Sequence, residues 1–147
     1  MRVLLQRVSS ASVTVDEAVV GKIGPGFLLL VGIGQEDTAQ DVDTLAVKIS
    51  RLRIFPDENG KMNLDLEKVG GQILSVSQFT LYADLTRGNR PGFSRAATPD
   101  EGKRLWEAFN AKLLELGFEV QTGIFGADMK VKLVNDGPVT MMLDSQF

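Results

Sequence analysis

The sequence predicts a mixed α/β fold in a single domain spanning residues 1–147. N-terminal antiparallel strands and interleaved later strands would form two packed sheets or a barrel-like core, with two main helices on one side. Three observations carry this prediction. Short apolar runs bounded by turn residues occupy both ends of the chain. Two segments repeat apolar residues at helical spacing. No internal repeat, low-complexity segment or linker divides the sequence, and 147 residues suit one domain with a substantial core.

The chain opens with segments that have the pattern of antiparallel hairpins. The strongest turn signal among them is Gly24-Pro25-Gly26, which separates the last two segments. Alternation is clear at Val13 and Val15, which share one face while Thr14 points to the other. Four strands are therefore predicted at residues 2–8, 11–15, 19–23 and 27–33.

The first helix is predicted to begin after Thr38. This threonine can cap the helix, and Asp41 stands three residues on, where an acidic side chain completes a weak capping box. The residues expected on its buried face recur at helical spacing: Val42, Leu45, Ala46, Ile49 and Leu52.

The second helix has the clearest start signal in the chain. Thr98 is the expected cap, Pro99 occupies the first helical position, and Glu101 closes a capping box. Gly117 is placed where glycine commonly ends a helix. The expected buried stripe consists of Leu105, Phe109, Leu113 and Leu116, with Trp106 beside it.

Shorter strands are expected between and after the two helices. The residues in 56–60 have turn chemistry, and 62–66 is expected to be a short extended piece. Residues 72–80 begin apolar and β-branched, as a buried central strand does. The full set of these later strands is 51–55, 72–80, 119–122, 129–133 and 139–143.

The chain contains neither Cys nor His. Their absence excludes disulfides, thiolate nucleophiles, Ser-His-Asp machinery and the commonest metal ligand. No apolar run approaches the roughly 20 residues of a membrane helix, and the N-terminus lacks the pattern of a signal peptide. The net charge of −3 does not by itself indicate nucleic-acid binding, although a local basic patch can hold RNA. We expect a cytoplasmic protein without cofactor, metal, membrane or DNA partner.

The strand predicted at 72–80 changes character along its length. Its second half places Ser77, Gln78 and Thr80 where a core strand should remain apolar. Buried polar groups cost free energy unless they are paired. A strand that becomes polar at its end, next to a Gly- and Arg-rich loop, is therefore a candidate site, although Ser and Thr also commonly satisfy neighbouring backbone.

A second candidate segment is Asn135-Asp136-Gly137-Pro138-Val139-Thr140. Asn-Asp-Gly-Pro between two predicted strands indicates a turn, and we interpret Asp136 as a turn residue. Gly137 has no side chain to shield its carbonyl, so the turn could present bare backbone oxygens. Only about 5–6% of X-Pro bonds are cis, so the sequence leaves the isomer at Pro138 open.

Together, Ser77-Gln78-Phe79-Thr80-Leu81 and Asn135-Asp136-Gly137-Pro138-Val139-Thr140 resemble the paired signatures of the D-aminoacyl-tRNA deacylase family, formerly called D-tyrosyl-tRNA deacylase. The resemblance spans essentially the whole chain in order. Further segments that carry it are Gln6-Arg7-Val8, Ala11-Ser12-Val13, Gly60-Lys61-Met62-Asn63-Leu64, Arg90-Pro91 to Ser94, Gln121-Thr122-Gly123, Phe125 and Ala127-Asp128-Met129.

The resemblance implies a cytoplasmic homodimer that hydrolyses the ester between a D-amino acid and the 3′ end of tRNA, and that also acts on glycine mischarged onto tRNA(Ala). It implies a cis Gly-Pro peptide that reaches into the partner's pocket as a chiral gate. The implied roles are Ser77, Gln78, Phe79 and Thr80 for the catalytic pocket, Gly137 and Pro138 for the gate, Arg7 for its support, and Phe125 and Met129 for the terminal adenosine.

The residues suit ester hydrolysis in two ways. A backbone N–H near Phe79 or Thr80 can stabilise the oxyanion. The nucleophile is either water, oriented with help from the ribose 2′-hydroxyl, or the hydroxyl of Thr80. We favour water, because Thr80 has no His to accept its proton. Arg87, Arg90, Lys130 and Lys132 are candidates for phosphate contacts.

Three other interpretations remain open from the sequence alone. A covalent esterase would use Thr80 or Ser77 as nucleophile. A non-catalytic RNA-binding dimer module would need neither His nor Cys. A metal hydrolase with carboxylate ligands only is disfavoured by the missing His.

Overall fold

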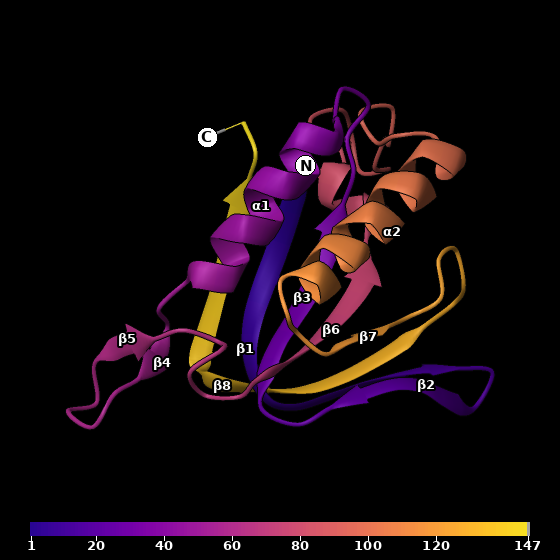
Figure 1. Cartoon of the computed structure of the whole chain (residues 1–147). Helices are drawn as coiled ribbons and strands as arrows, with labels where there is room; N and C mark the ends of the chain where they lie inside the picture. Colours follow the sequence, from indigo (N-terminus) through magenta and orange to yellow (C-terminus); the bar gives the residue numbers. More distant parts are fainter. Residues whose placement is uncertain (147) are drawn as a thin grey trace.

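The computed structural model describes residues 1–146, and Phe147, the last residue of the predicted 1–147 domain, lies outside the described part. Two helices lie side by side across one face of a curved sheet, and a small hairpin projects at one corner (Figure 1). The elements are β1 (Arg2–Val15), β2 (Ala18–Ile23), β3 (Gly26–Gly32), α1 (Ala39–Arg51), β4 (Phe55–Pro56), β5 (Met62–Leu64), β6 (Gln72–Ser77), a 3₁₀ helix η1 (Phe79–Tyr82), α2 (Pro99–Glu115), β7 (Val120–Thr122) and β8 (Lys130–Asp144).

The six-stranded sheet is organised around β1. One edge of this strand pairs with β3 along its first half and with β2 along its second half, while its other edge pairs with β8 along almost its whole length. These pairings are antiparallel, whereas β6 is parallel to both β3 and β7. The sheet is therefore mixed and bends back on itself, which confirms the predicted barrel-like α/β core with both helices on one side.

The central strand β6 is buried on both faces. Ile73 packs in the larger core between the sheet and the helices, whereas Leu74 and Val76 pack in a second core on the opposite face. A strand buried on both sides must be apolar at successive positions rather than alternating. This explains why residues 73–76 form a nearly continuous apolar run, interrupted only by Ser75, which is fully buried.

The helix α1 follows its prediction closely. The carboxylate of Asp41 accepts hydrogen bonds from the Thr38 backbone N–H at 2.8 Å and from the Thr38 hydroxyl at 3.1 Å. Four of the five predicted apolar residues are buried. The fifth, Leu52, is the C-cap, where the extended backbone ends the helix.

The helix α2 has the predicted bounds but not the predicted cap. The side chain of Thr98 makes no capping hydrogen bond. Glu101 instead pairs with Arg104, whose Nε donates to the carboxylate at 2.7 Å, so the expected capping box does not form. Gly117 ends the helix as predicted, with φ +101°. Neither helix of residues 1–146 combines the length and hydropathy that a bilayer crossing requires.

Several predicted strand bounds were wrong. Residues 2–8 and 11–15 belong to the single strand β1, because register shifts opposite β8 near Val8 bend the strand without breaking it. Of the strand predicted at 51–55, only Phe55 pairs, with Leu64 of β5. The strand predicted at 72–80 stops at Ser77, and the chain turns into η1.

The turn predicted at 135–138 was also wrong. The strands predicted at 129–133 and 139–143 are two halves of β8, which pair with the same neighbour, β1, without reversing direction. Val8 pairs with Asn135 and Gln6 pairs with Thr140, so residues 136–139 stand opposite Arg7 alone. We call residues 135–138 the bulge. It lies at the bend of β8 beside the β4–β5 hairpin (Figure 1).

Candidate functional site

The polar residues at the end of β6 lie at the carboxyl edge of the parallel strands β3 and β6. Ser77 pairs with Val31 as the last register position, and the Gln78 N–H donates to the Val31 carbonyl at 2.7 Å. The chain then leaves the sheet as η1. Ligands of sheets with parallel strands commonly bind beyond the carboxyl ends of those strands. The change from apolar to polar residues therefore coincides with the place where a site is expected.

A cavity of about 350 Å³ opens at this edge. Its walls come from the ends of β3 and β6, the first turns of α2 and the loop after β7. They are mostly apolar. The lining residues are Val31, Ile33, Ser77, Gln78, Phe79, Phe93, Ala96, Ala97, Thr98, Pro99, Gly102, Trp106, Phe125 and Gly126.

A second hollow of about 270 Å³ adjoins the cavity. It extends toward the start of β8 and is lined in part by Asp128, Met129 and Val131. The residues that line both spaces are Ser77, Gln78, Phe79, Phe125 and Gly126. The structure therefore brings together five of the predicted site residues at one place: Ser77, Gln78, Phe79, Phe125 and Met129.

Trp106 supports this region from α2, although its sequence pattern predicted only a place beside the buried stripe of that helix. Its indole Nε1 donates to the buried Ser75 hydroxyl at 3.0 Å, and its ring lies 5.9 Å from that of Phe125. A Cβ on Gly102 would meet the Phe125 ring at 3.4 Å. The signal in the sequence was a large aromatic residue beside the helical stripe, together with a polar residue inside an apolar strand.

Thr80 is placed differently from the three residues before it. It is exposed, lines neither space, and its hydroxyl accepts a hydrogen bond from the Gln78 side-chain amide. The backbone N–H groups of Phe79 and Thr80 have no hydrogen-bond acceptor among residues 1–146. The first N–H groups of a helix commonly lack partners, because no earlier turn of the helix supplies carbonyls to accept from them. Both N–H groups are available as donors, and Phe79 lines the cavity.

Ionisable groups are scarce around the two spaces. Asp128 is the only charged residue among those lining them. Tyr82 follows in η1, and burial is the main cause that raises its pKa above the usual range, so its phenol stays neutral. Within residues 1–146 no cluster of three acidic side chains could hold a metal ion. The cavity itself is lined by hydroxyl, amide and backbone groups rather than by a general base.

The bulge is held by a buried arginine. Arg7 is only 7% exposed. Its Nη1 donates to the Ile54 carbonyl at 2.5 Å, and its Nε donates to the Asp136 carbonyl at 3.2 Å. The Asp136 carboxylate lies 3.6 Å from the same nitrogen. This one side chain therefore joins β1, the segment before the hairpin and the bulge.

Gly137 is required by two features of the bulge. Its φ is +121°, a conformation that L side chains rarely adopt, and a Cβ there would lie 2.8 Å from Nη2 of Arg7. The Gly137–Pro138 peptide bond is cis. Asn135 closes the bulge, since its side-chain carbonyl accepts from the Val139 N–H at 3.3 Å.

Within one chain, the bulge and the cavity do not meet. Gly137 and Pro138 are exposed and line neither space. Arg7 pairs with Phe27 near the start of β3, whereas Ser77 pairs with Val31 near its end. Four residues of strand separate these positions by roughly 13 Å. The predicted gate and pocket therefore lie at opposite ends of the same strand.

Comparison with known proteins gives consistent matches over the full chain. The sequence profile of the D-Tyr-tRNA(Tyr) deacylase family matches residues 4–144. The D-aminoacyl-tRNA deacylase of Staphylococcus carnosus (strain TM300) is 56% identical, over 99% of this chain and 97% of that protein. The D-aminoacyl-tRNA deacylase of Deinococcus radiodurans is 54% identical, over 98% of this chain and 99% of that protein.

Two solved structures share the fold. The c-Myc DNA Unwinding Element Binding Protein superposes with a TM-score of 0.92 at 37% identity, with 98% of each chain covered. A probable eukaryotic D-amino acid tRNA deacylase superposes with a TM-score of 0.83, with 97% of each chain covered. Its identity is 18%, so that second likeness concerns the fold alone. The arrangement of sheet and helices is thus shared across sequences that have diverged widely.

Proposed function

This chain belongs to the D-Tyr-tRNA(Tyr) deacylase family, and from that premise we propose that it is a D-aminoacyl-tRNA deacylase that acts in the cytoplasm. It hydrolyses the ester between a D-amino acid and the ribose of the terminal adenosine, and it releases the free D-amino acid and tRNA. The observation that carries this proposal is the family match over residues 4–144. The cavity at the end of β6 supports it, because three of the family-signature residues line that cavity.

The chemistry we propose needs no side-chain nucleophile. A water oxygen bonds to the ester carbonyl carbon, and the resulting oxyanion accepts hydrogen bonds from the unpaired N–H groups of Phe79 and Thr80. The bond from carbon to the ribose oxygen then breaks. The neighbouring 2′-hydroxyl orients the water and relays its proton to the leaving oxygen. This mechanism is supported by the absence of a general base among the residues that line the cavity.

The terminal adenosine is proposed to occupy the second hollow. Phe125 offers an aromatic face there, and Met129 lies at the hollow's other wall. Aromatic side chains commonly stack on bases, and the Met sulfur packs well against aromatic rings. With the base in this hollow, the ester would lie beside Ser77 and Gln78, which line both spaces.

Chirality is proposed to be sorted by a second copy of the chain. In the homodimer, the carbonyls of Gly137 and Pro138 from one subunit would enter the other's pocket and hold the substrate's α-ammonium group. An L side chain would then collide with that backbone, whereas a D side chain would point away from it. Glycine has no side chain that could collide. Glycyl-tRNA(Ala) is accordingly a substrate. The exposure of the bulge and its fixation by Arg7 support this role.

A covalent mechanism through Thr80 or Ser77 is the nearest alternative. Thr80 lies outside both spaces, and its hydroxyl contacts the uncharged amide of Gln78 rather than a base. An unactivated hydroxyl is a weak nucleophile. These observations favour attack by water.

The proposed function is tested by comparing deacylation of D-tyrosyl-, L-tyrosyl- and glycyl-tRNA side by side. We expect release of D-tyrosine and glycine but not of L-tyrosine. Repeating the assay with a 2′-deoxy terminal adenosine should strongly slow hydrolysis. Equal cleavage of D- and L-charged tRNA would contradict the gate. No release by a well-folded preparation would favour a non-catalytic RNA-binding module.

A further inference from the structure

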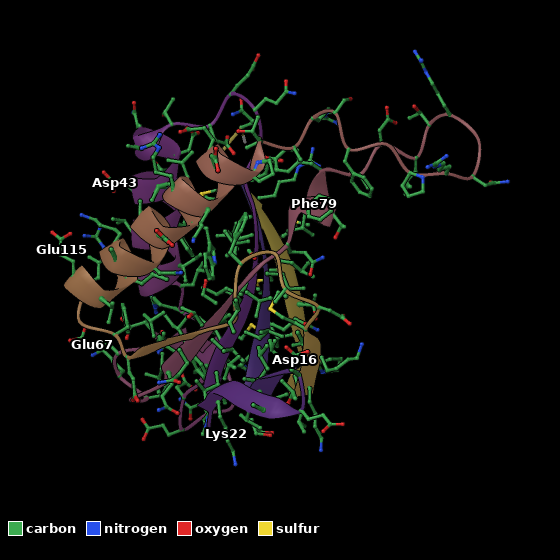
Figure 2. All side chains as sticks on the ribbon, turned by 90° about the vertical axis from the view of Figure 1, so that its right-hand side faces the viewer. Asp16, Lys22, Asp43, Glu67, Phe79 and Glu115 are labelled. Carbon is green, nitrogen blue, oxygen red and sulfur yellow. The ribbon has the colours of Figure 1, made fainter. Side chains whose placement is uncertain are left out.

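A long loop leaves the body of the protein beside the candidate site. Residues 84–95, which we call the basic arm, connect the end of η1 to the segment before α2. Figure 2 shows this loop extending far from the rest of the chain, with Phe79 near its root. The arm is rich in Gly and Arg, and the proposed chemistry makes no use of it.

The arm is positively charged in a protein that is negative as a whole. Between Asp84 and Asp100 the only charged residues are Arg87, Arg90 and Arg95, while the net charge of the chain is −3. All three arginines are exposed, and none forms an ion pair with another residue of the described chain. Arg95 nevertheless lies near Asp84 and shares a hollow with Glu36 and Asp37. The guanidinium groups of Arg87 and Arg90 are the ones that face solvent without an ion-pair partner in the described chain.

The acidic residue at the root of the arm has a structural role. The carboxylate of Asp84 accepts hydrogen bonds from the Thr86 hydroxyl at 2.6 Å and from the Thr86 N–H at 3.0 Å. The hydroxyl bond is the main cause that lowers the pKa of Asp84. Asp84 thus organises the first turn of the arm rather than pairing with Arg87 or Arg90.

The root of the arm is fixed relative to the cavity. Asp84 and Gly92 exchange backbone hydrogen bonds at 2.7 and 3.0 Å, which close the loop. The ring of Phe93 packs edge-on against Phe79 with centroids 5.0 Å apart, and both residues line the cavity. The arm therefore projects from a fixed root beside the cavity.

We propose that Arg87 and Arg90 bind backbone phosphates of the tRNA strand that leads to the aminoacylated adenosine. This inference rests on the proposed function, because it takes the ester in the cavity as given. The strand must then leave the cavity carrying one negative charge per nucleotide. Arginine matches phosphate with two parallel hydrogen bonds and is the usual residue for such contacts. The arm is the cationic surface that adjoins the site.

The other basic candidates are less suited to this role. Lys130 lies 3.5 Å from the Asp128 carboxylate, which offsets its charge. Lys132 lines a separate hollow with Ser10, Ser12 and Lys22, away from the residues of the cavity. Phosphate contacts orient a strand but carry no sequence information, so the arm would serve tRNAs of any identity.

The test compares two double variants with the same change of charge. In the first, R87Q and R90Q neutralise the arm. In the control, R51Q and K68Q neutralise two exposed residues at the end of α1 and before β6. Each is assayed with D-tyrosyl-tRNA across a range of salt concentrations, and with D-tyrosyl-adenosine, which carries the ester but no phosphate. Thermal unfolding confirms that both variants fold.

We expect the arm variant to raise KM for D-tyrosyl-tRNA with little change in kcat, and to leave hydrolysis of D-tyrosyl-adenosine unchanged. Each phosphate contact contributes about 0.7 to the slope of log affinity against log salt for single strands. Loss of two contacts should therefore make the ratio of wild-type to arm-variant affinity for D-tyrosyl-tRNA fall about sevenfold between about 50 mM and about 200 mM salt. The control variant should follow the wild-type slope.

Two results would overturn the proposal. One is an unchanged KM and salt slope in the arm variant while the wild type is active, which would leave the deacylase function intact. The other is an equal loss on D-tyrosyl-adenosine, which would place the arginines' effect at the ester rather than at phosphates. Inactivity of the wild type on D-tyrosyl-tRNA would instead refute the proposed function, and with it the premise of this inference.

Discussion

The cavity at the end of β6 and the bulge in β8 are two candidate functional regions on the same sheet, built in opposite ways. The cavity is enclosed by strands, a helix and a loop of one chain, and its wall continues into the hydrophobic core through Trp106 and Phe125. The bulge is exposed, and a single buried side chain, Arg7, holds it from below. The walls of the cavity thus come from one chain, whereas the bulge presents its groups outward.

This difference shows which interactions hold each region in its conformation. The cavity residues are held by packing, which is non-directional and tolerates small adjustments. The bulge is held by directed hydrogen bonds to a buried charge, which must stay paired because an unpaired buried charge is costly. Disturbing either region should therefore reduce stability or rate, but only disturbing the bulge should alter the selectivity between D- and L-substrates.

The largest effect is expected from Gly137→Ala. The new Cβ would lie 2.8 Å from Nη2 of the buried Arg7, and alanine would have to adopt a φ of +121°. The bulge must therefore move. A displacement of about 1 Å in a positioning group can cost about 100-fold in rate, and we expect a loss of that order in kcat/KM for D-tyrosyl-tRNA. Gly60→Ala is the matched control, because its φ is +75° and nothing lies within 4 Å. Equal losses in both variants would remove the bulge from the mechanism.

Arg7→Lys is expected to have the next largest effect. A single ammonium group cannot reproduce the bonds to both the Ile54 and the Asp136 carbonyls. We expect a loss of about 1.5–3 kcal/mol in the free energy of unfolding, measured by urea denaturation, with a reduced preference for D- over L-tyrosyl-tRNA. Arg104→Lys, in the exposed pair with Glu101, should leave the free energy of unfolding nearly unchanged, because solvent screens an exposed ion pair. An unchanged preference in Arg7→Lys would show that the bulge does not need this support.

Trp106→Phe tests the packing around the cavity. The change leaves the buried Ser75 hydroxyl without the indole donor, which should cost about 1–3 kcal/mol in the free energy of unfolding. Adding Ser75→Ala should recover part of that loss, since the hydroxyl is then gone. The preference for D- over L-substrates should not change. Simple additivity of the two substitutions in urea denaturation would mean that this hydrogen bond is not stabilising.

Thr80→Ala should have a small effect. The hydroxyl lies outside both spaces and contacts only the Gln78 amide, so we expect deacylation within about tenfold of wild type, because it is not the nucleophile. Removing a true nucleophile typically costs about 10⁴-fold or more in kcat. A collapse of that size, measured in a single-turnover assay, would establish the covalent alternative.

The smallest effect is expected from acid at the hairpin beside the bulge. The Lys61 N–H bond to the Asp57 carboxylate is the main cause that lowers the pKa of Asp57. A lowered pKa in the folded state stabilises the hairpin above the ordinary carboxyl pKa of about 3.9 and loses that contribution as pH falls through the lowered value. NMR amide shifts of Asn59 and Lys61 should therefore move below pH about 4, before those of Trp106 and Phe125. If the amide shifts of all four residues moved at the same pH, the hairpin and the cavity would respond to acid as one cooperative unit.

The predictions from sequence succeeded where a pattern is local and repeated. Both helices appeared near their predicted positions because several apolar residues at helical spacing support each other. The Asn135-Asp136-Gly137-Pro138 prediction failed because turn residues suit a bulge as well as a chain reversal. Only the pairing of both halves of β8 with β1 distinguishes the two. The Thr98 capping box failed: the Glu101 carboxylate accepts hydrogen bonds from Arg104 rather than from the backbone of Thr98.

The sequence by itself determined the chemistry that this protein can use: no thiol or imidazole, an apolar strand that ends in polar residues, and motifs that identify the family. Only the tertiary structure decided which of those residues share a cavity and which face outward. Ser77, Trp106 and Phe125 come together because strand, helix and loop bury their apolar faces against one another, and Gly137 faces outward because Arg7 is buried beneath it. Such contacts join residues far apart in the chain, and their free energy exists only once the core has closed.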